Sequence, residues 1–237
     1  MSDFLQDCLV SIELEPSDSI LNQLNKYYEM LVEKNKVMNL TAITEYEEVV
    51  IKHFVDSILI SKVFDMDKIN SIIDVGTGAG FPGVVLKVFY PDKNITLLDS
   101  LNKRINFLKE VSDELELSKL KCQHGRAEDF ARLPKEREGY DLCVSRAVAN
   151  LSTLSEYCLP FVKKGGYFVA YKAEDCKEEV NGAFAAIKQL GGVVEDTILY
   201  NIPNTDITRA FVIIKKINNT NKKFPRKAGL PTKEPLK

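Results

Sequence analysis

A glycine-dense turn is the clearest candidate binding site in this sequence. Gly76, Gly78 and Gly80 follow the apolar run 72–75, and Pro82 then opens a predicted helix. Glycine lets the backbone of such a turn adopt positive φ and approach a ligand closely. The unpaired amides at the start of the helix point toward the same place. The stretch therefore predicts a site for a cofactor that contains a nucleoside.

The glycine run fits two cofactor templates at once. Residues 76–80 read G-x-G-x-G, which is typical of methyltransferases that use S-adenosylmethionine, and residues 78–83 read the G-x-G-x-x-G of dinucleotide binders. Asp99 follows about 20 residues later and could bind the ribose hydroxyls in either class. The glycine motif alone does not separate the two classes.

Three features favour S-adenosylmethionine. Asp74 lies on the first predicted strand just ahead of the glycines, where a carboxylate would repel a pyrophosphate but suit an ammonium and a sulfonium group. Residues 125–128 follow the third predicted strand, and Ala127 and Glu128 could there reach the adenine edge. No second catalytic domain remains to bind a hydride acceptor. An NAD-dependent oxidoreductase is kept as the alternative.

The elements around this turn predict an α/β fold. Apolar runs and amphipathic stretches alternate from residue 71 onward, which indicates a parallel sheet covered by helices on both sides. No helix separates the last two predicted strands, so we expect them to form a terminal antiparallel hairpin. The predicted strands are 72–75, 95–98, 120–123, 142–145, 167–171, 193–200 and 210–215, and the helices between them include 102–115, 151–162 and 175–190. Seven strands in this order predict the Rossmann-like class I S-adenosylmethionine-dependent methyltransferase fold.

The chain divides into three predicted segments. Residues 1–65 form a small helical region, with helices over 20–37 and from residue 45, and 66–217 form the cofactor-binding methyltransferase domain. Residues 218–237 form a basic tail with six basic residues against one acidic residue, whereas residues 1–65 carry twelve acidic and five basic residues. The formal net charge of −2 hides this asymmetry. The tail is typical of a polyanion-binding segment or of a solvated, solubilising one.

Several classes of protein do not fit the composition. No apolar run approaches the ~20 residues of a membrane span, and the acidic N-terminus lacks the basic start of a signal peptide. Five scattered cysteines without a C-x-x-C pair indicate reduced thiols in a cytoplasmic protein. His53 and His124 have no Cys or His partner at ligand spacing, so no metal site is expected.

The motifs together resemble the RsmG (GidB) family of 16S rRNA guanine-N7 methyltransferases, over nearly the whole chain. The glycine loop is generic, but Ser-Arg-Ala-Val at 145–148 and Pro-Arg-Lys-Ala-Gly at 225–229 are specific in combination. Further matching stretches are 38–43, 53–57, 98–100, 103–104 and 125–128. The resemblance implies S-adenosylmethionine as cofactor and the small ribosomal subunit as partner. With the residues argued above, the predicted cofactor contacts are Gly76, Gly78, Phe81, Asp99, Ala127, Glu128 and Arg146.

Methylation of guanine N7 needs no catalytic base. N7 already carries an accessible lone pair, so the enzyme has only to place it in line with the methyl group. The position after the fourth predicted strand lacks the Asp/Asn-Pro-Pro-aromatic motif of amine methyltransferases, and the chain has no Pro-Cys dipeptide like that of pyrimidine C5 methyltransferases. Arg146, at this position, is the candidate for positioning the reactants.

The RNA substrate places its own demands on the sequence. N7 lies in the deep, narrow major groove of A-form RNA, so the target must be an unpaired nucleotide in a loop. Basic side chains would contact its phosphates. The candidates are Lys103, Arg104, Arg126, Lys172, Arg209, Arg226 and Lys227. We expect the protein to act as a monomer.

Some residues keep two interpretations. His53 is either a buried histidine bonded to a backbone carbonyl or part of a substrate rim with Asn39 and Asp56. Lys103 and Arg104 are either phosphate contacts or solvated helix charges. At the level of the whole chain, a non-catalytic ribosome- or RNA-binding assembly factor with a vestigial pocket is the second alternative.

Overall fold

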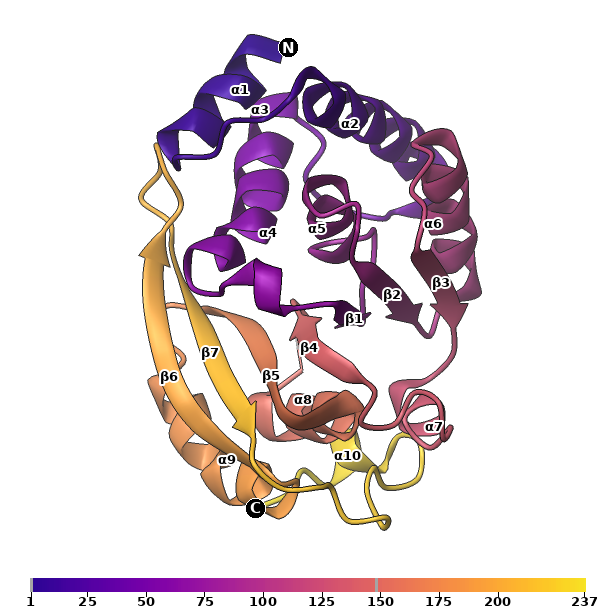
Figure 1. Cartoon of the computed structure of the whole chain (residues 1–237), viewed down its shortest axis with the longest axis vertical. Coiled ribbons are helices and arrows are strands. Elements are labelled where there is room, and N and C mark those ends of the chain that lie inside the picture. The colour runs from indigo at the N-terminus through magenta and orange to yellow at the C-terminus, as the bar shows by residue number, and fades with distance from the viewer. Residues whose placement is uncertain (1, 148) are drawn as a thin grey trace.

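A seven-stranded sheet forms the centre of the computed structural model, which describes residues 2–147 and 149–237 (Figure 1). Val148, the last residue of the Ser-Arg-Ala-Val motif, lies outside the described residues. The strand order is β3-β2-β1-β4-β5-β7-β6. The strands are β1 (Ser71–Val75), β2 (Asn94–Asp99), β3 (Leu120–His124), β4 (Tyr140–Ser145), β5 (Val162–Ala173), β6 (Gly192–Asn201) and β7 (Thr208–Lys216).

The pairing confirms the predicted fold. β3, β2, β1, β4 and β5 run parallel, and β7 pairs antiparallel with both β5 and β6. All seven strands occur where the apolar runs placed them, and the last two form the expected hairpin. The strand order reverses beside β1, between β1 and β4. Ligands of open α/β sheets bind at the carboxyl ends of the strands at such a point.

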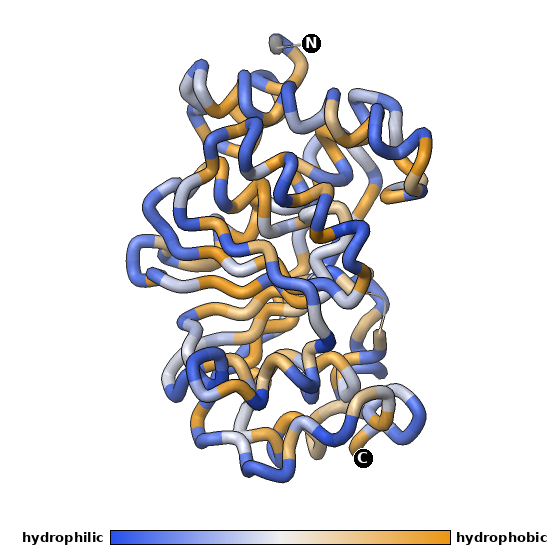
Figure 2. Tube along the Cα trace, turned by 90° about the vertical axis from the view of Figure 1, so that its right-hand side faces the viewer, coloured by the Kyte–Doolittle hydropathy of each residue, from blue (hydrophilic) through white to orange (hydrophobic). Residues whose placement is uncertain are grey.

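Helices cover both faces of the sheet (Figure 1). Successive strand residues point to opposite faces, so Ile72 and Leu97 enter one core whereas Ile73 and Leu98 enter the other. Figure 2 shows the strands in the middle as mostly hydrophobic. One face carries α1 (Ser2–Ser11), α2 (Asp18–Met38), α3 (Tyr46–Val49), α4 (Asp56–Ile58), α5 (Gly83–Phe89) and α6 (Asn102–Glu114), and the other carries α7 (Ala127–Phe130), α8 (Leu151–Cys158), α9 (Lys177–Gln189) and α10 (Leu230–Lys233).

The N-terminal helices share one core with the sheet. α2 begins after Ser17, whose hydroxyl accepts a hydrogen bond from the amide of Ile20, and its buried face includes Leu24 and Tyr27. α1 was not expected from the sequence, although its Leu5 and Leu9 are fully buried in the same core. The segment boundaries at residues 65 and 217 stay predictions.

The helix expected from residue 45 is not regular. α3 passes into a π-helical segment, η1 (Val50–Val55), and then into α4 and the 3₁₀ segment η2 (Leu59–Lys62). A π-segment shifts the side chains that follow it relative to a regular helix, and such segments are frequent at functional sites. Two further 3₁₀ turns, η3 (Met66–Lys68) and η4 (Leu159–Phe161), precede β1 and β5.

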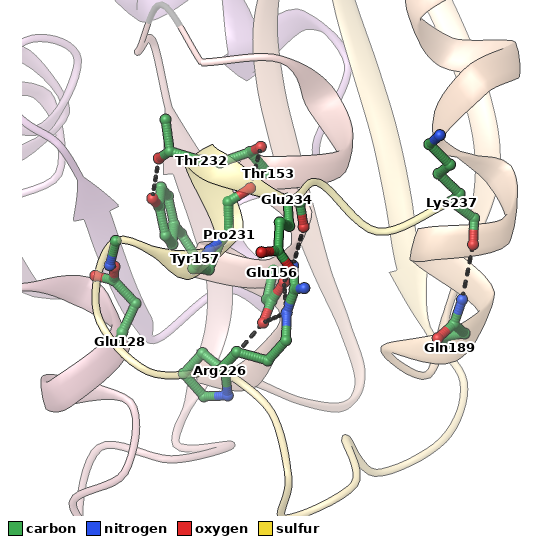
Figure 3. A network of polar contacts seen from close by, with 12 residues as sticks. Glu128, Thr153, Glu156, Tyr157, Gln189, Arg226, Pro231, Thr232, Glu234 and Lys237 are labelled. Atoms are coloured by element: carbon green, nitrogen blue, oxygen red, sulfur yellow. Dashed lines mark hydrogen bonds and ion pairs between the residues drawn. The ribbon is translucent and has the colours of Figure 1, made fainter.

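The basic tail folds back onto α8 (Figure 3). Glu156 is fully buried, and both its carboxylate oxygens accept hydrogen bonds from the guanidinium of Arg226 at 2.7–3.0 Å. The hydroxyl of Thr153 donates to the carbonyl of Pro231 (3.0 Å), and the hydroxyls of Tyr157 and Thr232 lie 2.7 Å apart. Arg226 was predicted to contact RNA phosphate, but its guanidinium is engaged because a buried carboxylate needs a paired charge. This favours a structural role.

We expect Arg226→Met to lower the free energy of unfolding by about 3–5 kcal/mol, because it leaves Glu156 buried without its partner. Urea unfolding followed by circular dichroism measures the change. Lys227→Met is the matched control, since Lys227 is the exposed neighbour in the same tail. Equal stability of the two variants would show that the ion pair does not hold the tail.

Candidate functional site

A cavity of ≈ 450 Å³ lies at the carboxyl ends of the strands where the strand order reverses. It brings together all the residues predicted to bind the cofactor. These are Gly76, Gly78, Phe81, Asp99, Ala127, Glu128 and Arg146. Residues far apart in the sequence thus meet at the place that the strand order predicts for a ligand. Their contacts to a cofactor stay predictions.

The glycine turn is held open by backbone geometry. Gly76 and Gly78 have φ of +74° and +62°, a left-handed conformation that glycine favours. The amide of Gly76 donates to the carbonyl of Leu98 at 2.9 Å, which ties the turn to β2. Behind the turn, the buried hydroxyl of Tyr27 donates to the carbonyl of Ala79 at 2.6 Å. The N-terminal helix α2 therefore supports the loop directly.

The structure corrects the role expected for Asp74. Its side chain is fully buried beneath the turn, where Oδ2 accepts hydrogen bonds from the hydroxyl of Thr77 (2.7 Å) and the amide of Gly83 (2.9 Å). The carboxylate therefore fixes the loop and the start of α5 instead of facing a cofactor cation. The sequence suggested that the first amide of α5 points into the cavity. In the structure this amide, that of Gly83, donates to Asp74 instead.

Two other acids sit in the cavity wall. Asp99 accepts hydrogen bonds from the amides of Leu101 (2.8 Å) and Gly78 (3.0 Å), and its Oδ2 lies 3.3 Å from Nη1 of Arg104. Arg104, a predicted phosphate contact, therefore lies at the cavity, paired with Asp99. Glu128 accepts a hydrogen bond from the amide of Gly229 at 2.8 Å, so the C-terminal tail holds the Glu128 side chain in the cavity wall (Figure 3).

Arg146 is oriented by a buried carboxylate. Its Nη1 donates to Oδ2 of Asp56 (2.7 Å) and to the carbonyl of Lys52 (3.2 Å), and its guanidinium carbon lies 5.2 Å from the ring centre of Phe81. Asp56 is 2% exposed, and its other oxygen accepts a hydrogen bond from the hydroxyl of Tyr200 on β6. Asp56 is therefore the support beneath the cavity rather than part of its rim.

His53 combines a feature of each interpretation that the sequence left open, since it lies beside a backbone carbonyl and lines the cavity, but Asn39 and Asp56 do not line the cavity with it. Its ring lines the cavity and stacks on Phe81 with ring centres 4.5 Å apart, while Nδ1 lies 3.1 Å from the carbonyl of Lys52. Burial, together with the positive charge of Arg146, lowers the pKa of His53 to about 3. The imidazole is therefore neutral near pH 7. Asn39, the third residue of the proposed rim, instead ends α2 in a left-handed conformation.

Several lining residues were not predicted from the sequence as contacts, among them Leu40, Thr41, Ser100, Ala149, Leu154 and Tyr157. The hydroxyl oxygen of Thr41 lies 3.0 Å from Nε2 of His53. Thr41 belongs to the Asn-Leu-Thr-Ala-Ile stretch that carried the resemblance, so that motif was the available signal.

The remaining basic residues differ in their environment. Lys103, Arg126 and Lys227 are exposed, and Arg126 also lines the cavity. Lys172 is largely buried and pairs with Glu179 at 2.7 Å. Arg209 is half-buried on β7. The exposed three are thus the best placed of the predicted phosphate contacts.

Neither a membrane span nor a metal cluster occurs in the described residues. Over residues 2–147 and 149–237, no helix is long and apolar enough to cross a bilayer, and no three His, Cys, Asp or Glu side chains are grouped to hold a metal ion. All five cysteines are unpaired thiols.

Asp74 predicts a pH dependence of stability. Burial raises its pKa from 3.8 to about 6, so the folded state binds the proton more tightly than the unfolded state. The contribution of the Asp74 carboxyl to the free energy of unfolding is fully present below about pH 4 and is lost as the pH rises through about 6. Asn at this position keeps an acceptor for Thr77 and Gly83 and cannot ionise. Urea unfolding across this range should therefore show wild type losing stability relative to Asp74→Asn, and a constant difference would contradict the assignment.

Comparison with known proteins agrees with this geometry. The family described as GidB, rRNA small subunit methyltransferase G, matches residues 20–208. Ribosomal RNA small subunit methyltransferase G of Clostridium botulinum (strain Loch Maree / Type A3) is 50% identical over 235 residues, which cover 99% of this chain and 98% of that protein. The protein of that name from Alkaliphilus oremlandii is 50% identical over 237 residues, which cover 100% and 99% of the two chains.

A solved structure supports the fold alone. M. jannaschii TYW2 in complex with AdoMet superposes with a TM-score of 0.51 at 13% identity, covering 62% of this chain and 69% of that chain. The family itself is shown by the match over residues 20–208 and by the relatives that are 50% identical over nearly the full length: the chain belongs to the family of ribosomal RNA small subunit methyltransferases G.

Proposed function

We propose that this protein transfers a methyl group from S-adenosylmethionine to N7 of a guanine in a loop of 16S rRNA. The observation that carries the proposal is that the glycine turn, Asp99, Glu128 and Arg146 meet in one cavity at the strand-order reversal. Family membership supports the methyltransferase reaction and the small-subunit rRNA substrate. Neither the NAD-dependent oxidoreductase nor the non-catalytic assembly factor has comparable support.

The cavity offers a distinct environment to each part of the cofactor. Asp99 lies where a carboxylate can accept hydrogen bonds from ribose hydroxyls, and Ala127 with Glu128 lies beside it on the adenine side. The glycine turn leaves space for the methionine portion near Arg146. Bound there, S-adenosylmethionine supplies an electrophilic methyl group on a sulfonium.

The protonation states of the cavity suit methylation at N7. His53 is neutral, and its low pKa makes it a poor proton acceptor near pH 7. Asp74, whose pKa is raised, is buried outside the cavity lining. A nucleophile that must first lose a proton would find no suitable base among these groups, whereas N7 attacks through a lone pair that it already has. The chain's task is then to align N7 with the methyl group.

We further propose that the protein acts as a monomer on the small ribosomal subunit in the cytoplasm. Lys103 at the start of α6, Arg126 beside the cavity and Lys227 in the tail would contact the phosphates of the target loop. They would orient the RNA without reading its bases.

Methyl transfer can be tested with S-adenosylmethionine tritiated on the methyl group. We expect label in 7-methylguanosine at one position when the protein acts on small subunits from a strain that lacks this gene. Nucleoside digestion and chromatography identify the product. Label in another nucleoside, or no label although the cofactor binds, would refute the proposed reaction.

The phosphate contacts predict a salt dependence. Replacing Lys103 and Lys227 by alanine should weaken binding to the small subunit and flatten the plot of log K against log salt by about 0.7–0.9 per lost contact. Cofactor affinity should not change. Lys68→Ala is the control, because Lys68 is exposed and precedes β1, at the amino ends of the strands and thus away from the cavity at their carboxyl ends. An unchanged slope in the double variant would assign these lysines to solubility alone.

A further inference from the structure

The chain of hydrogen bonds around His53 begins at Arg146. Arginine can only donate hydrogen bonds, and Nη2 of Arg146 lies 3.2 Å from Nδ1 of His53. Nδ1 also lies 3.1 Å from the carbonyl of Lys52, to which it could donate only if it were protonated. That carbonyl already accepts a hydrogen bond from Nη1 of Arg146. The two neighbours of Nδ1 call for opposite roles, because the guanidinium can only donate and the carbonyl can only accept. The carbonyl of Lys52 already has a donor in Nη1 of Arg146, whereas Nη2 of Arg146 has no role other than donating, so Nδ1 is assigned as the acceptor of Nη2.

The tautomer of His53 then fixes the role of its other nitrogen. A neutral imidazole that accepts at Nδ1 carries its proton on Nε2. The pKa of His53, lowered to about 3, keeps the ring neutral at working pH. Nε2 therefore donates to Oγ1 of Thr41 at 3.0 Å.

The Thr41 hydroxyl is thereby restricted to donating. Its oxygen accepts hydrogen bonds from Nε2 of His53 and from the amide of Ile43 (3.0 Å), which occupy both lone pairs. The hydroxyl proton is therefore available for a third partner. Because Thr41 lines the cavity, that partner can be a bound molecule. The loop that carries Thr41 is fixed, because Oδ1 of Asn35 accepts hydrogen bonds from the amides of Leu40 (2.6 Å) and Thr41 (2.9 Å).

The position of this donor suits the substrate end of the cavity. In the proposed function, Asp99, Ala127 and Glu128 form the adenosine side. Thr41 contacts His53, His53 stacks on Phe81, and Arg146 lies beside both rings, so these residues form one cluster in the cavity wall. Next to N7, guanine presents the O6 acceptor, while adenine presents an N6 amino donor. A hydroxyl that can only donate pairs with O6 and opposes the amino group of adenine.

We propose that Thr41 selects guanine by donating a hydrogen bond to O6 while N7 attacks the methyl group. This inference rests on the proposed function. His53 and Arg146 act as positioning residues that keep the hydroxyl a donor. Thr41 contacts the base and thus determines specificity.

The test combines variants of Thr41 with a change in the base. Thr41→Val keeps the shape of the side chain and removes the hydroxyl, and Thr41→Ser keeps the hydroxyl. Each enzyme is given small subunits reconstituted with 16S rRNA that carries either guanine or 2-aminopurine, which lacks O6, at the methylated position. Single-turnover methylation rates are measured at saturating cofactor, and cofactor affinity is measured by calorimetry.

Loss of one neutral hydrogen bond predicts a fall of about fivefold to tenfold in the rate of Thr41→Val on guanine. The decisive quantity is the guanine to 2-aminopurine rate ratio, which should be about fivefold to tenfold larger in wild type than in Thr41→Val. Dividing the two ratios cancels the different intrinsic reactivity of N7 in the two bases. Thr41→Ser should retain the wild-type ratio, and cofactor affinity should be equal in all three proteins.

Equal ratios in wild type and Thr41→Val would overturn the inference and assign O6 to another donor, such as a remaining N–H of Arg146. A Thr41→Ser variant that behaves like Thr41→Val would also overturn it. Failure of the proposed function would look different, because wild type itself would then leave guanine unlabelled. If Thr41→Val does not fold, Thr41→Ala replaces it with the same two substrates, and equal ratios there overturn the inference equally.

Discussion

The buried ion pair of Asp56 and Arg146 is the interaction on which the site depends. A carboxylate with 2% exposure is stable only with a paired charge and full hydrogen bonding, and Arg146 and Tyr200 supply both. The pair joins α4 to the end of β4 and, through Tyr200, to β6, so it connects the N-terminal helices to the half of the sheet that runs from β4 to β6. It also fixes the guanidinium over Phe81 and next to His53. The arrangement of Arg146, Phe81 and His53 in the cavity thus depends on one buried ion pair.

Much of the fold could be predicted from local patterns. Every strand was found from its apolar residues. Central strands such as β1 and β4 are buried on both faces and therefore require nearly continuous hydrophobic sequence, whereas the edge strands β3 and β6 are partly exposed and carry polar residues between apolar ones. The glycine turn and Asp99 were recognised because positive φ and the spacing to the second strand are local properties. The hairpin of β6 and β7 followed from the absence of a helix between them.

Other features depend on contacts between distant segments, and no local pattern carries them. Glu156 lies on an amphipathic helix, where an acid is usually solvated, and it is buried only because Arg226 returns to it from the tail. Asp74 lies on β1 just ahead of the glycine turn, a position that predicts a cofactor contact, yet the direction of its side chain is set by Thr77 and Gly83. The π-segment that places His53 has no marker in composition. The structure therefore brings the residues predicted to bind the cofactor to one cavity, whereas the sequence did not predict their partners within the protein.

The wall of the cavity draws on widely separated parts of the chain. Thr41 lies before the first strand, whereas Gly229, which holds Glu128 through its amide, follows the last one. Chains emerge from the ribosome in sequence order. The cavity is therefore incomplete in a nascent chain until residues near 229 have been synthesised and have packed on α8. A chain made only as far as the last strand exposes the glycine turn without the full wall of the cavity, so the wall is completed only after Gly229 has been made.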